Sequence, residues 1–381
     1  MPIFRQRQAL AGLLLFKATF IIRHRDISVI KRLLPFVLLF AMSFSIQADD
    51  THSMLTGKNV LILYKKDDIL SKKIAAYYAD KRSVPSSQQL GIQLDSNSST
   101  LSRSQFNQLE KTIQPHLSKN IKVILLTWTK PYRVKCMSIT SAVTLGFDEQ
   151  YCSHNADHQT GCHPTKNSPL FNISRSKANQ SPPWRLSMML SGENFEQAKA
   201  LIDRGIEADG SDPVGDAYLV RTQDANRSTR WPIFKQLVSL WPRYKGITLH
   251  YVDDRYRVKG SSVNHKNQLM FYFTGLPQVP DINTNHYLPG AIADHLTSAG
   301  GNGIGEGGQM KTYRWLEAGA TASYGTVIEP CNYPEKFPNP RILLPNYMTG
   351  DHLIQAYWKS VQQPGEGLFV GEPLARPWSA K

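Results

Sequence analysis

The sequence predicts an α/β fold in which a mostly parallel sheet is sandwiched by helices. Short apolar runs, such as residues 58–64 and 121–127, alternate with segments whose apolar residues recur at helical spacing. Strands that are apolar on both sides are typical of parallel sheets covered on both faces. Residues 289–330 read as strand, glycine-rich loop, helix and strand, which is the pattern of a βαβ unit.

The elements follow in order along the chain. Strands are predicted at residues 58–64, 121–127, 217–221, 247–252, 269–273, 291–296 and 320–327, and regular structure of unassigned type at 185–190. Helices are predicted at residues 69–79, 104–114, 194–208, 233–240, 309–317 and 353–361. Asp67 or Asp68 is suited to cap the first helix and Thr349 the last, because such side chains accept hydrogen bonds from free helix amides.

Residues 129–183 have a different composition. They are rich in Ser, Asn, His and Pro, are only weakly periodic and hold three of the four cysteines. Loops of this length without a covalent link are rare in compact domains. We therefore expect one large α/β domain at residues 58–377, with residues 129–183 as a disulfide-pinned insertion that contains Cys and His.

The amino terminus has the features of an export signal. Lys31 and Arg32 precede an apolar run at residues 33–44, and Ala48 is a small residue suited to the cleavage position. We expect residues 1–48 to be a signal peptide and 49–57 a linker, so that the product is periplasmic or secreted. The alternative is an uncleaved signal anchor, which would be the one predicted membrane contact, although the run is shorter than the roughly 20 residues that span a bilayer.

The charge of the chain is concentrated at its start. The formal net charge is +14, and the first 48 residues hold seven of the 44 Lys and Arg residues but one of the 30 Asp and Glu residues. The remaining 37 basic and 29 acidic residues give +8. This mild excess suits anionic polymers or membranes and also suits an ordinary solvated surface. No nucleic-acid partner is predicted, because the sequence has no clustered run of Lys and Arg.

Four cysteines follow the predicted signal: Cys136, Cys152, Cys162 and Cys331. An even number in an exported chain favours disulfide bonds. Cys152 with Cys162 would close a short loop and leave Cys136 for Cys331. A metal site with the neighbouring histidines is the alternative, but the spacing of a zinc site is missing, so no metal is predicted.

Several stretches together resemble an uncharacterised exported bacterial family that co-occurs with exosortase and exopolysaccharide systems. The matching stretches are LLTWTKPYR at 125–133, MSIT at 137–140, MMLSGENF at 188–195, ALID at 200–203, PGAIADHLTSAGG at 289–301, GATASYGTVIEPC at 319–331 and KFP at 336–338. Glu372 departs from the pattern, since the family resemblance leads us to expect Asp there. The resemblance covers nearly all of residues 58–377 and implies an accessory protein that binds a peptide or a glycan.

A more distant resemblance is to caspase-like cysteine peptidases of the gingipain type. On that scheme Thr274-Gly275 stands at the catalytic His-Gly position, and Thr297-Ser298-Ala299 stands at the position of the nucleophilic Cys. Neither catalytic residue type is kept. Thiolate chemistry needs a cysteine with a nearby base, so this resemblance implies a related fold without ordinary cysteine-peptidase activity.

The predicted ligand site lies where strand 291–296 ends, because ligands of open α/β sheets bind at the carboxyl ends of the strands. The candidate ligand-binding residues are Thr274, Gly275, Asp294, Thr297, Gly300, Gly301 and Gly303. Asp294 and His295 are adjacent on a strand and are therefore expected to point to opposite faces of the sheet. The favoured interpretation is a binding edge without catalysis and without a cofactor.

Four different chemistries compete with this interpretation. A periplasmic hydrolase would use Ser298 as the nucleophile, His295 or His286 as the base and the glycine-loop amides as an oxyanion cradle. A dinucleotide pattern at Gly303, Gly305 and Gly308 begins too far from its strand. A divalent-metal site and a carbohydrate-stacking platform are two further hypotheses. Their residues would be Asp281, His286, Asp294 and His295 for the metal and Trp128, Tyr132, Arg133 and Trp184 for the platform.

Overall fold

The computed structural model describes residues 54–94, 98–153, 162–174, 177, 184–304 and 308–378. All of them belong to one compact unit, Ser53–Lys381. The predicted signal peptide and most of the predicted linker lie outside the described residues.

An 11-stranded sheet forms the centre of this unit, in the order β2-β1-β4-β7-β14-β13-β12-β11-β8-β10-β9. Its strands are β1 (Val60–Lys65), β2 (Gln89–Ile92), β4 (Val123–Leu126), β7 (Leu186–Met189), β8 (Gly215–Arg221), β9 (Arg243–Tyr244), β10 (Ile247–Asp253), β11 (Leu269–Thr274), β12 (Tyr287–His295), β13 (Ala322–Thr326) and β14 (Gly367–Gly371). A smaller sheet contains β3 (Thr100–Leu101), β5 (Arg133–Val134) and β6 (Met137–Ser138).

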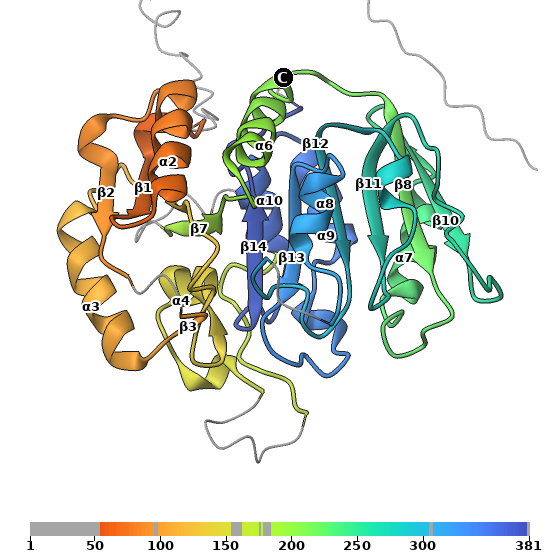
Figure 1. The fold of residues 1–381 in the computed structure, drawn as a ribbon. Helices are drawn as coiled ribbons and strands as arrows, with labels where there is room; N and C mark the ends of the chain where they lie inside the picture. Colours follow the sequence, from red (N-terminus) through yellow and green to blue (C-terminus); the bar gives the residue numbers. More distant parts are fainter. Residues whose placement is uncertain are drawn as a thin grey trace, which may run out of the picture. The chain divides into compact units, whose positions relative to one another are not determined.

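The predicted parallel character of the sheet is confirmed. Within the described residues, the neighbours in the large sheet are parallel except β13 with β14 and β10 with β9. The strand β14, which comes last along the described chain, lies in the middle of the sheet, between β7 and β13 (Figure 1). Because β14 runs parallel to β7 and antiparallel to β13, the strands from β2 to β14 and those from β13 to β10 run in opposite directions.

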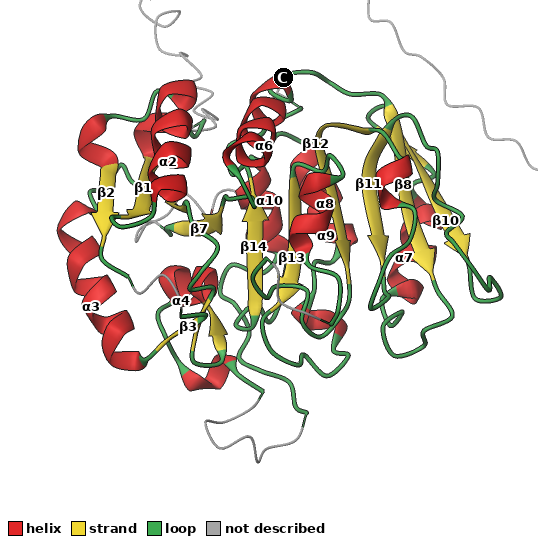
Figure 2. Ribbon diagram, viewed as in Figure 1, coloured by secondary structure: helices red, strands yellow, loops and turns green. Residues whose placement is uncertain are grey.

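Helices cover both faces of the sheet, as predicted. They are α2 (Ile69–Arg82), α3 (Arg103–Ile113), α4 (Ile139–Leu145), α6 (Phe195–Glu207), α7 (Trp231–Leu240), α8 (Thr312–Glu317), α9 (Pro340–Met348) and α10 (Leu353–Ser360). Figures 1 and 2 show α6 and α8 in front of the sheet and α9 and α10 behind it. The two layers bury the central strands, so that Leu61, Leu125 and Phe271 are all fully inaccessible to solvent, whereas β2, β9 and β10 toward the two edges are partly exposed.

The local sequence explains where most helices begin. Asp68 caps α2 by accepting a hydrogen bond from the Ser71 amide at 2.9 Å, and Asn194 caps α6 through the Gln197 amide at 3.0 Å. The prediction for Thr349 was wrong, because its hydroxyl donates to the Pro345 carbonyl at 2.7 Å and lies at the end of α9.

The stretch at residues 289–330 forms the predicted βαβ unit of β12, α8 and β13. Ile292 of β12 pairs with Ala322 of β13 in parallel register. The segment predicted as an insertion has more regular structure than expected, since β5, β6 and α4 lie within it. Ile139 and Ala142 of α4 are fully buried, so this part of the segment belongs to the core of the domain.

Candidate functional site

Three neighbouring strands, β8, β11 and β12, end at the same edge of the sheet. Leu219 of β8 pairs with Phe273 of β11, and Thr274 of β11 pairs with His295 of β12. The loops that follow these strands carry the polar residues of the predicted site. We call this region the strand-end site and define it by Arg227, Thr274, Thr297, Ser298 and Gln309.

A hydrogen-bonded network joins two loops of the strand-end site. Arg227 Nε donates to Thr297 Oγ1 at 3.2 Å, and Arg227 Nη1 pairs with Asp224 at 2.8 Å. The Thr297 hydroxyl donates to Gln309 Oε1 at 2.5 Å, and the Ala299 amide donates to the same oxygen at 2.9 Å. The amide oxygen of Gln309 is therefore engaged twice, which leaves its NH₂ group as a donor.

The glycine-rich loop packs tightly on the neighbouring strand. A Cβ on Gly301 would lie 2.3 Å from the Gly325 carbonyl oxygen, so only glycine permits this approach. The Gly301 amide donates to Thr326 O at 2.9 Å, and Gly300 O accepts from the Thr312 amide at 2.8 Å. The Gly301 amide is thus engaged within the fold and does not form the predicted oxyanion cradle.

Gly303 meets a part of the chain from the other half of the sheet. A Cβ placed on it would lie 3.0 Å from Lys130 Cε and 3.2 Å from the Tyr132 ring. Lys65, at the end of β1, donates through Nζ to the Lys130 carbonyl at 3.2 Å. These contacts bring further cationic side chains toward the glycine loop. The dinucleotide-like pattern extends into residues 305–307, which lie outside the described residues.

Thr274 and Gly275 support the site from beneath. Thr274 is 2% exposed, and its carbonyl accepts from Arg230 Nη2 at 2.8 Å. A Cβ on Gly275 would lie 1.8 Å from the Arg227 carbonyl oxygen, so this glycine allows the Arg227 loop to lie against β11. Thr274 and Gly275 both lie at the predicted carboxyl edge of the sheet. Their contacts position the loop that carries Arg227.

Asp294 and His295 point to opposite faces of the sheet, as predicted. Asp294 is fully buried, and one of its oxygens accepts from Arg230 Nη2 at 2.6 Å. Burial raises the pKa of Asp294 to about 6, although the Arg230 guanidinium acts in the opposite direction. Asp294 is therefore enclosed beneath the edge and does not face a ligand directly.

His295 is engaged through both ring nitrogens. Trp315 Nε1 donates to His295 Nδ1 at 2.9 Å, so Nδ1 is the acceptor nitrogen and Nε2 carries the proton. His295 Nε2 lies 3.1 Å from the Met310 carbonyl, to which it donates. Burial lowers the pKa of this imidazole to about 3, while the bond to Met310 acts in the opposite direction. His295 is thus a neutral residue of the core.

The structure does not assemble the predicted serine–histidine pair. Ser298 is half-buried at the strand end, and within the described residues no hydrogen bond joins its hydroxyl to a histidine. His286 precedes the nine-residue strand β12, so the length of a strand, about 30 Å, separates it from Ser298. His295 is therefore engaged by Trp315 and Met310, and His286 lies at the opposite end of the strand from Ser298.

Arg227 is a site residue that the sequence did not reveal. It lies in the loop after β8, and it reaches Thr297 because β11, which separates β8 from β12, ends level with both. Strand order is decided by tertiary packing, and the sequence around Arg227 carries no signal for it. Lys311 was also missed, although only the glycine-rich loop separates it in sequence from Ala299, whose carbonyl accepts from Lys311 Nζ at 3.0 Å.

All four cysteines form disulfide bonds, but the suggested pairing was wrong. Cys136 pairs with Cys152, and Cys162 pairs with Cys331. The segment between β6 and β7 is thereby tied to the loop after β13, 169 residues further along the chain. Closeness in sequence favoured Cys152 with Cys162, but the fold brings each of them to a different partner.

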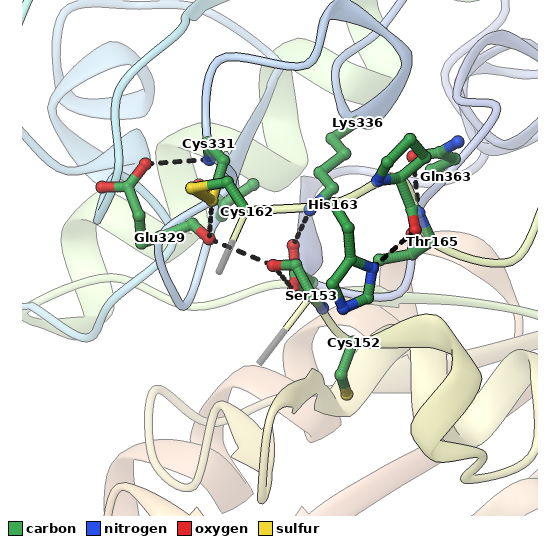
Figure 3. Close-up of polar contacts among 12 residues, drawn as sticks. Cys152, Ser153, Cys162, His163, Thr165, Glu329, Cys331, Lys336 and Gln363 are labelled. Carbon is green, nitrogen blue, oxygen red and sulfur yellow. Dashed lines mark hydrogen bonds and ion pairs between the residues drawn. A yellow bond between two sulfur atoms is a disulfide. The ribbon is translucent and has the colours of Figure 1, made fainter. Parts of the chain in front are cut away.

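A buried ion pair lies beside the second disulfide. Lys336 and Glu366 are almost inaccessible to solvent and lie 2.9 Å apart, and Glu366 also accepts from the amide and the hydroxyl of Ser153 at 2.6 Å each. Figure 3 shows Ser153 next to Glu329 and Cys162 next to Cys331. Burial lowers the pKa of Lys336, and the Glu366 carboxylate acts in the opposite direction. These contacts are structural, because no solvent reaches them.

Neither the metal hypothesis nor the carbohydrate-platform hypothesis finds a site. Within the described residues, no group of three His, Cys, Asp or Glu side chains could hold a metal ion. Trp128 and Tyr132 are 1% and 2% exposed, so they cannot stack on a carbohydrate. His154 and His158, which neighbour the cysteines in the sequence, lie outside the described residues.

A cavity of about 390 Å³ lies elsewhere, near the start of β1, and none of the sequence-predicted site residues lines it. Its charged lining comprises Lys81, Arg82, Asp209 and Arg376. Two of these charged residues are already paired within the fold. Arg82 forms ion pairs with Asp209 and with the buried Glu372. The cavity is therefore separate from the strand-end site.

Comparisons with protein-family models, with curated proteins and with solved structures find no match to this chain. They leave the family resemblances drawn from the sequence as expectations. Among the helices of the described part of the chain, none is long and apolar enough to cross a bilayer. The two disulfide bonds fit an oxidising compartment outside the cytoplasm.

Proposed function

We propose that this chain is an exported accessory protein of an exosortase or exopolysaccharide system that binds a peptide or a glycan at the strand-end site without catalysing a reaction. The observation that carries the proposal is the network of Arg227, Thr297 and Gln309, which gathers donors from two loops at one strand edge. The link to exosortase or exopolysaccharide systems rests on the sequence resemblance.

The chemistry of the network suits a ligand rich in hydrogen-bond acceptors. Arg227 is a quarter exposed and always charged, and the Gln309 NH₂ group is a second donor. Such donors bind peptide carbonyls and carboxylates or the oxygens of an acidic sugar. The engaged state of His295 supports binding without catalysis, since no histidine of the described residues pairs with the Ser298 hydroxyl.

The first test measures binding of acidic peptides and acidic oligosaccharides by calorimetry to the wild-type chain and to Arg227→Gln. Loss of a charge-assisted hydrogen bond is expected to weaken binding by about tenfold or more. Arg243→Gln is the matched control, because Arg243 is an exposed arginine on the edge strand β9. Equal affinity of wild type and Arg227→Gln for every ligand that binds would contradict the proposal.

The competing hydrolase hypothesis is tested at Ser298. Because no histidine pairs with this hydroxyl, we expect a fluorophosphonate probe to leave the wild-type chain unlabelled and Ser298→Ala to bind ligand as the wild type does. Stoichiometric labelling that disappears in Ser298→Ala would instead assign the site to a serine hydrolase.

A further inference from the structure

The loop between β10 and β11 presents an unusual surface, and it lies outside the strand-end network. We call residues Arg255, Tyr256, Arg257, Val258 and Lys259 the tip loop. Tyr256 and Val258 are 85% and 91% exposed, more than any other large apolar side chain of the described residues. They alternate with three cationic residues that are also exposed. Exposed apolar groups rimmed by charges mark interaction surfaces.

The base of the tip loop is closed by the buried carboxylate of Asp254 and the half-buried carboxylate of Asp281. Asp254, which is 8% exposed, accepts from the Ser262 amide at 3.0 Å and also from the Ser262 hydroxyl. Asp281 accepts from the Ser261 amide at 2.8 Å, and the Ser261 hydroxyl lies 3.0 Å from Tyr272 Oη. The two ends of the loop are therefore held together, and the tip extends beyond the end of β10 (Figure 1).

The tip loop keeps a cationic character despite two nearby carboxylates. Asp253 pairs with Arg255 at 2.8 Å, and Asp254 pairs with Arg257 at 3.4 Å. Lys259 forms no ion pair with any described residue. The three cations thus exceed the two acids, and the exposed side of each arginine stays open to solvent.

We propose that the tip loop docks this protein on an anionic lipid bilayer, with Tyr256 and Val258 in the interfacial layer and the three cations against lipid phosphates. Tyrosine is enriched at membrane interfaces, where its ring is apolar and its hydroxyl stays hydrated. Apolar residues next to Lys and Arg give reversible binding that depends on anionic lipid.

A bilayer explains the tip loop better than a polysaccharide does. The aliphatic side chain of Val258 offers a sugar no hydrogen bond and no ring face, yet it is the most exposed apolar side chain among the described residues. A projecting tip also enters a lipid interface without needing a matching groove. Asp253 at the end of β10 pairs in register with Arg221 at the end of β8, so the tip loop and the strand-end site share one edge of the sheet. Docking would hold the strand-end site close to the membrane surface.

Co-sedimentation with lipid vesicles tests the proposal. The chain used is Asp49–Lys381, which contains the whole compact unit that begins at Ser53 and lacks the apolar targeting segment. The vesicles contain phosphatidylcholine alone or with about one-third phosphatidylglycerol. We expect binding to the anionic vesicles only, and a decrease of about tenfold or more in Tyr256→Ser/Val258→Ser.

Two further variants test the contribution of the loop's charges and distinguish its effect from nonspecific hydrophobic adsorption. Arg255→Gln/Lys259→Gln is expected to weaken binding and to reduce its dependence on salt. Val214→Ser/Leu240→Ser is the matched apolar control, because these side chains are 59% and 56% exposed but precede β8 and β9, at the opposite end of β10. This control is expected to bind vesicles as the wild type does.

Three results would overturn the proposal: no wild-type binding to anionic vesicles, equal binding by Tyr256→Ser/Val258→Ser, or equal losses in the Val214→Ser/Leu240→Ser control. Retention on an alginate column that depends on Tyr256 and Val258, without vesicle binding, would assign the loop to an acidic polysaccharide and would also overturn it. Thermal unfolding of each variant verifies that the fold is intact. The ligand-binding test of Arg227→Gln is independent of these outcomes.

Discussion

Glu372 is a fully buried carboxylate whose neighbours fit it closely. Arg82 Nε and Nη2 donate to its two oxygens at 2.9 Å each, and the Tyr78 hydroxyl donates at 3.0 Å. Its side chain also fills the space beside α6, because a Cβ on Gly205 would lie 2.5 Å from Glu372 Cγ. Glu372 stands where the family resemblance leads us to expect Asp. The space for its longer side chain is provided by the missing side chain of Gly205, which is far away in the sequence.

Gly205→Ala is expected to destabilise the fold by about 1–3 kcal/mol, since overpacking against Glu372 exceeds the gain in helix propensity. The shorter side chain of Glu372→Asp makes room for the added methyl group, so the double variant should be more stable than the sum of the two single effects. Denaturant unfolding of the four proteins measures this coupling. Strict additivity would contradict it.

His295 behaves as a structural residue with a defined tautomer. Its folded pKa of about 3 lies below the ordinary value of 6.5. Its contribution to stability is thus complete above about pH 6.5 and is lost as the pH falls toward 3. Asp294 acts in the opposite sense, because its pKa of about 6 is above the ordinary 3.8, so stability from this group is complete below about pH 4 and is lost as the pH rises through 6.

We expect ¹⁵N NMR to find the His295 ring neutral, with its proton on Nε2, from pH 8 down to about pH 4, because burial opposes the charged form. An ordinary titration of His295 near pH 6.5 would show that the ring is accessible and would reopen its role as a base.

The two disulfide bonds act on different lengths of chain. Cys136–Cys152 closes 16 residues, whereas Cys162–Cys331 ties the insertion to the loop between β13 and α9. That loop leads into Lys336, the buried partner of Glu366. The second bond therefore adds a covalent link between segments that are also joined by the hydrogen bond from Ser153 to the Glu329 carbonyl and by their shared buried partner Glu366.

Cys162→Ser/Cys331→Ser is expected to lower the free energy of unfolding by about 2–4 kcal/mol, because it frees the longer loop of the unfolded chain. Cys136→Ser/Cys152→Ser should cost less, since its loop is shorter. Guanidinium unfolding compares the two variants with the wild type. A larger loss from the short bond would show that native contacts, and not loop length, decide the effect.

At the scale of the whole chain, the redox state of the cellular compartment determines whether the two disulfide bonds form. All four cysteines are paired, and within the described residues no thiol remains free. We expect the chain recovered from an exporting host to have no reactive thiol before reduction. The same chain made in a reducing cytoplasm should expose thiols and unfold at lower denaturant concentration. Thiol titration with Ellman's reagent checks both, and equal thiol content in the two preparations would contradict the expectation.

Local patterns predicted most strands of the large sheet, because strands such as β1, β4 and β11 are short, mainly apolar runs. The sequence could not predict α9, which follows three prolines, or α4, which lies in a polar segment. It also could not predict the Arg227–Thr297 contact or the disulfide pairing, since both depend on strand order and on contacts far apart in sequence. The site residues on β12 itself were found because strand alternation alone decides which face they occupy.

The central place of β14 has a consequence for the synthesis of the molecule. It emerges after every other strand, so two half-sheets would wait with open hydrogen-bonding edges at β7 and β13 until it arrives. The large sheet therefore stays open until residues 367–371 have been made. The same delay makes any shortened product that ends before Gly367 a candidate for rapid clearance by quality-control proteases.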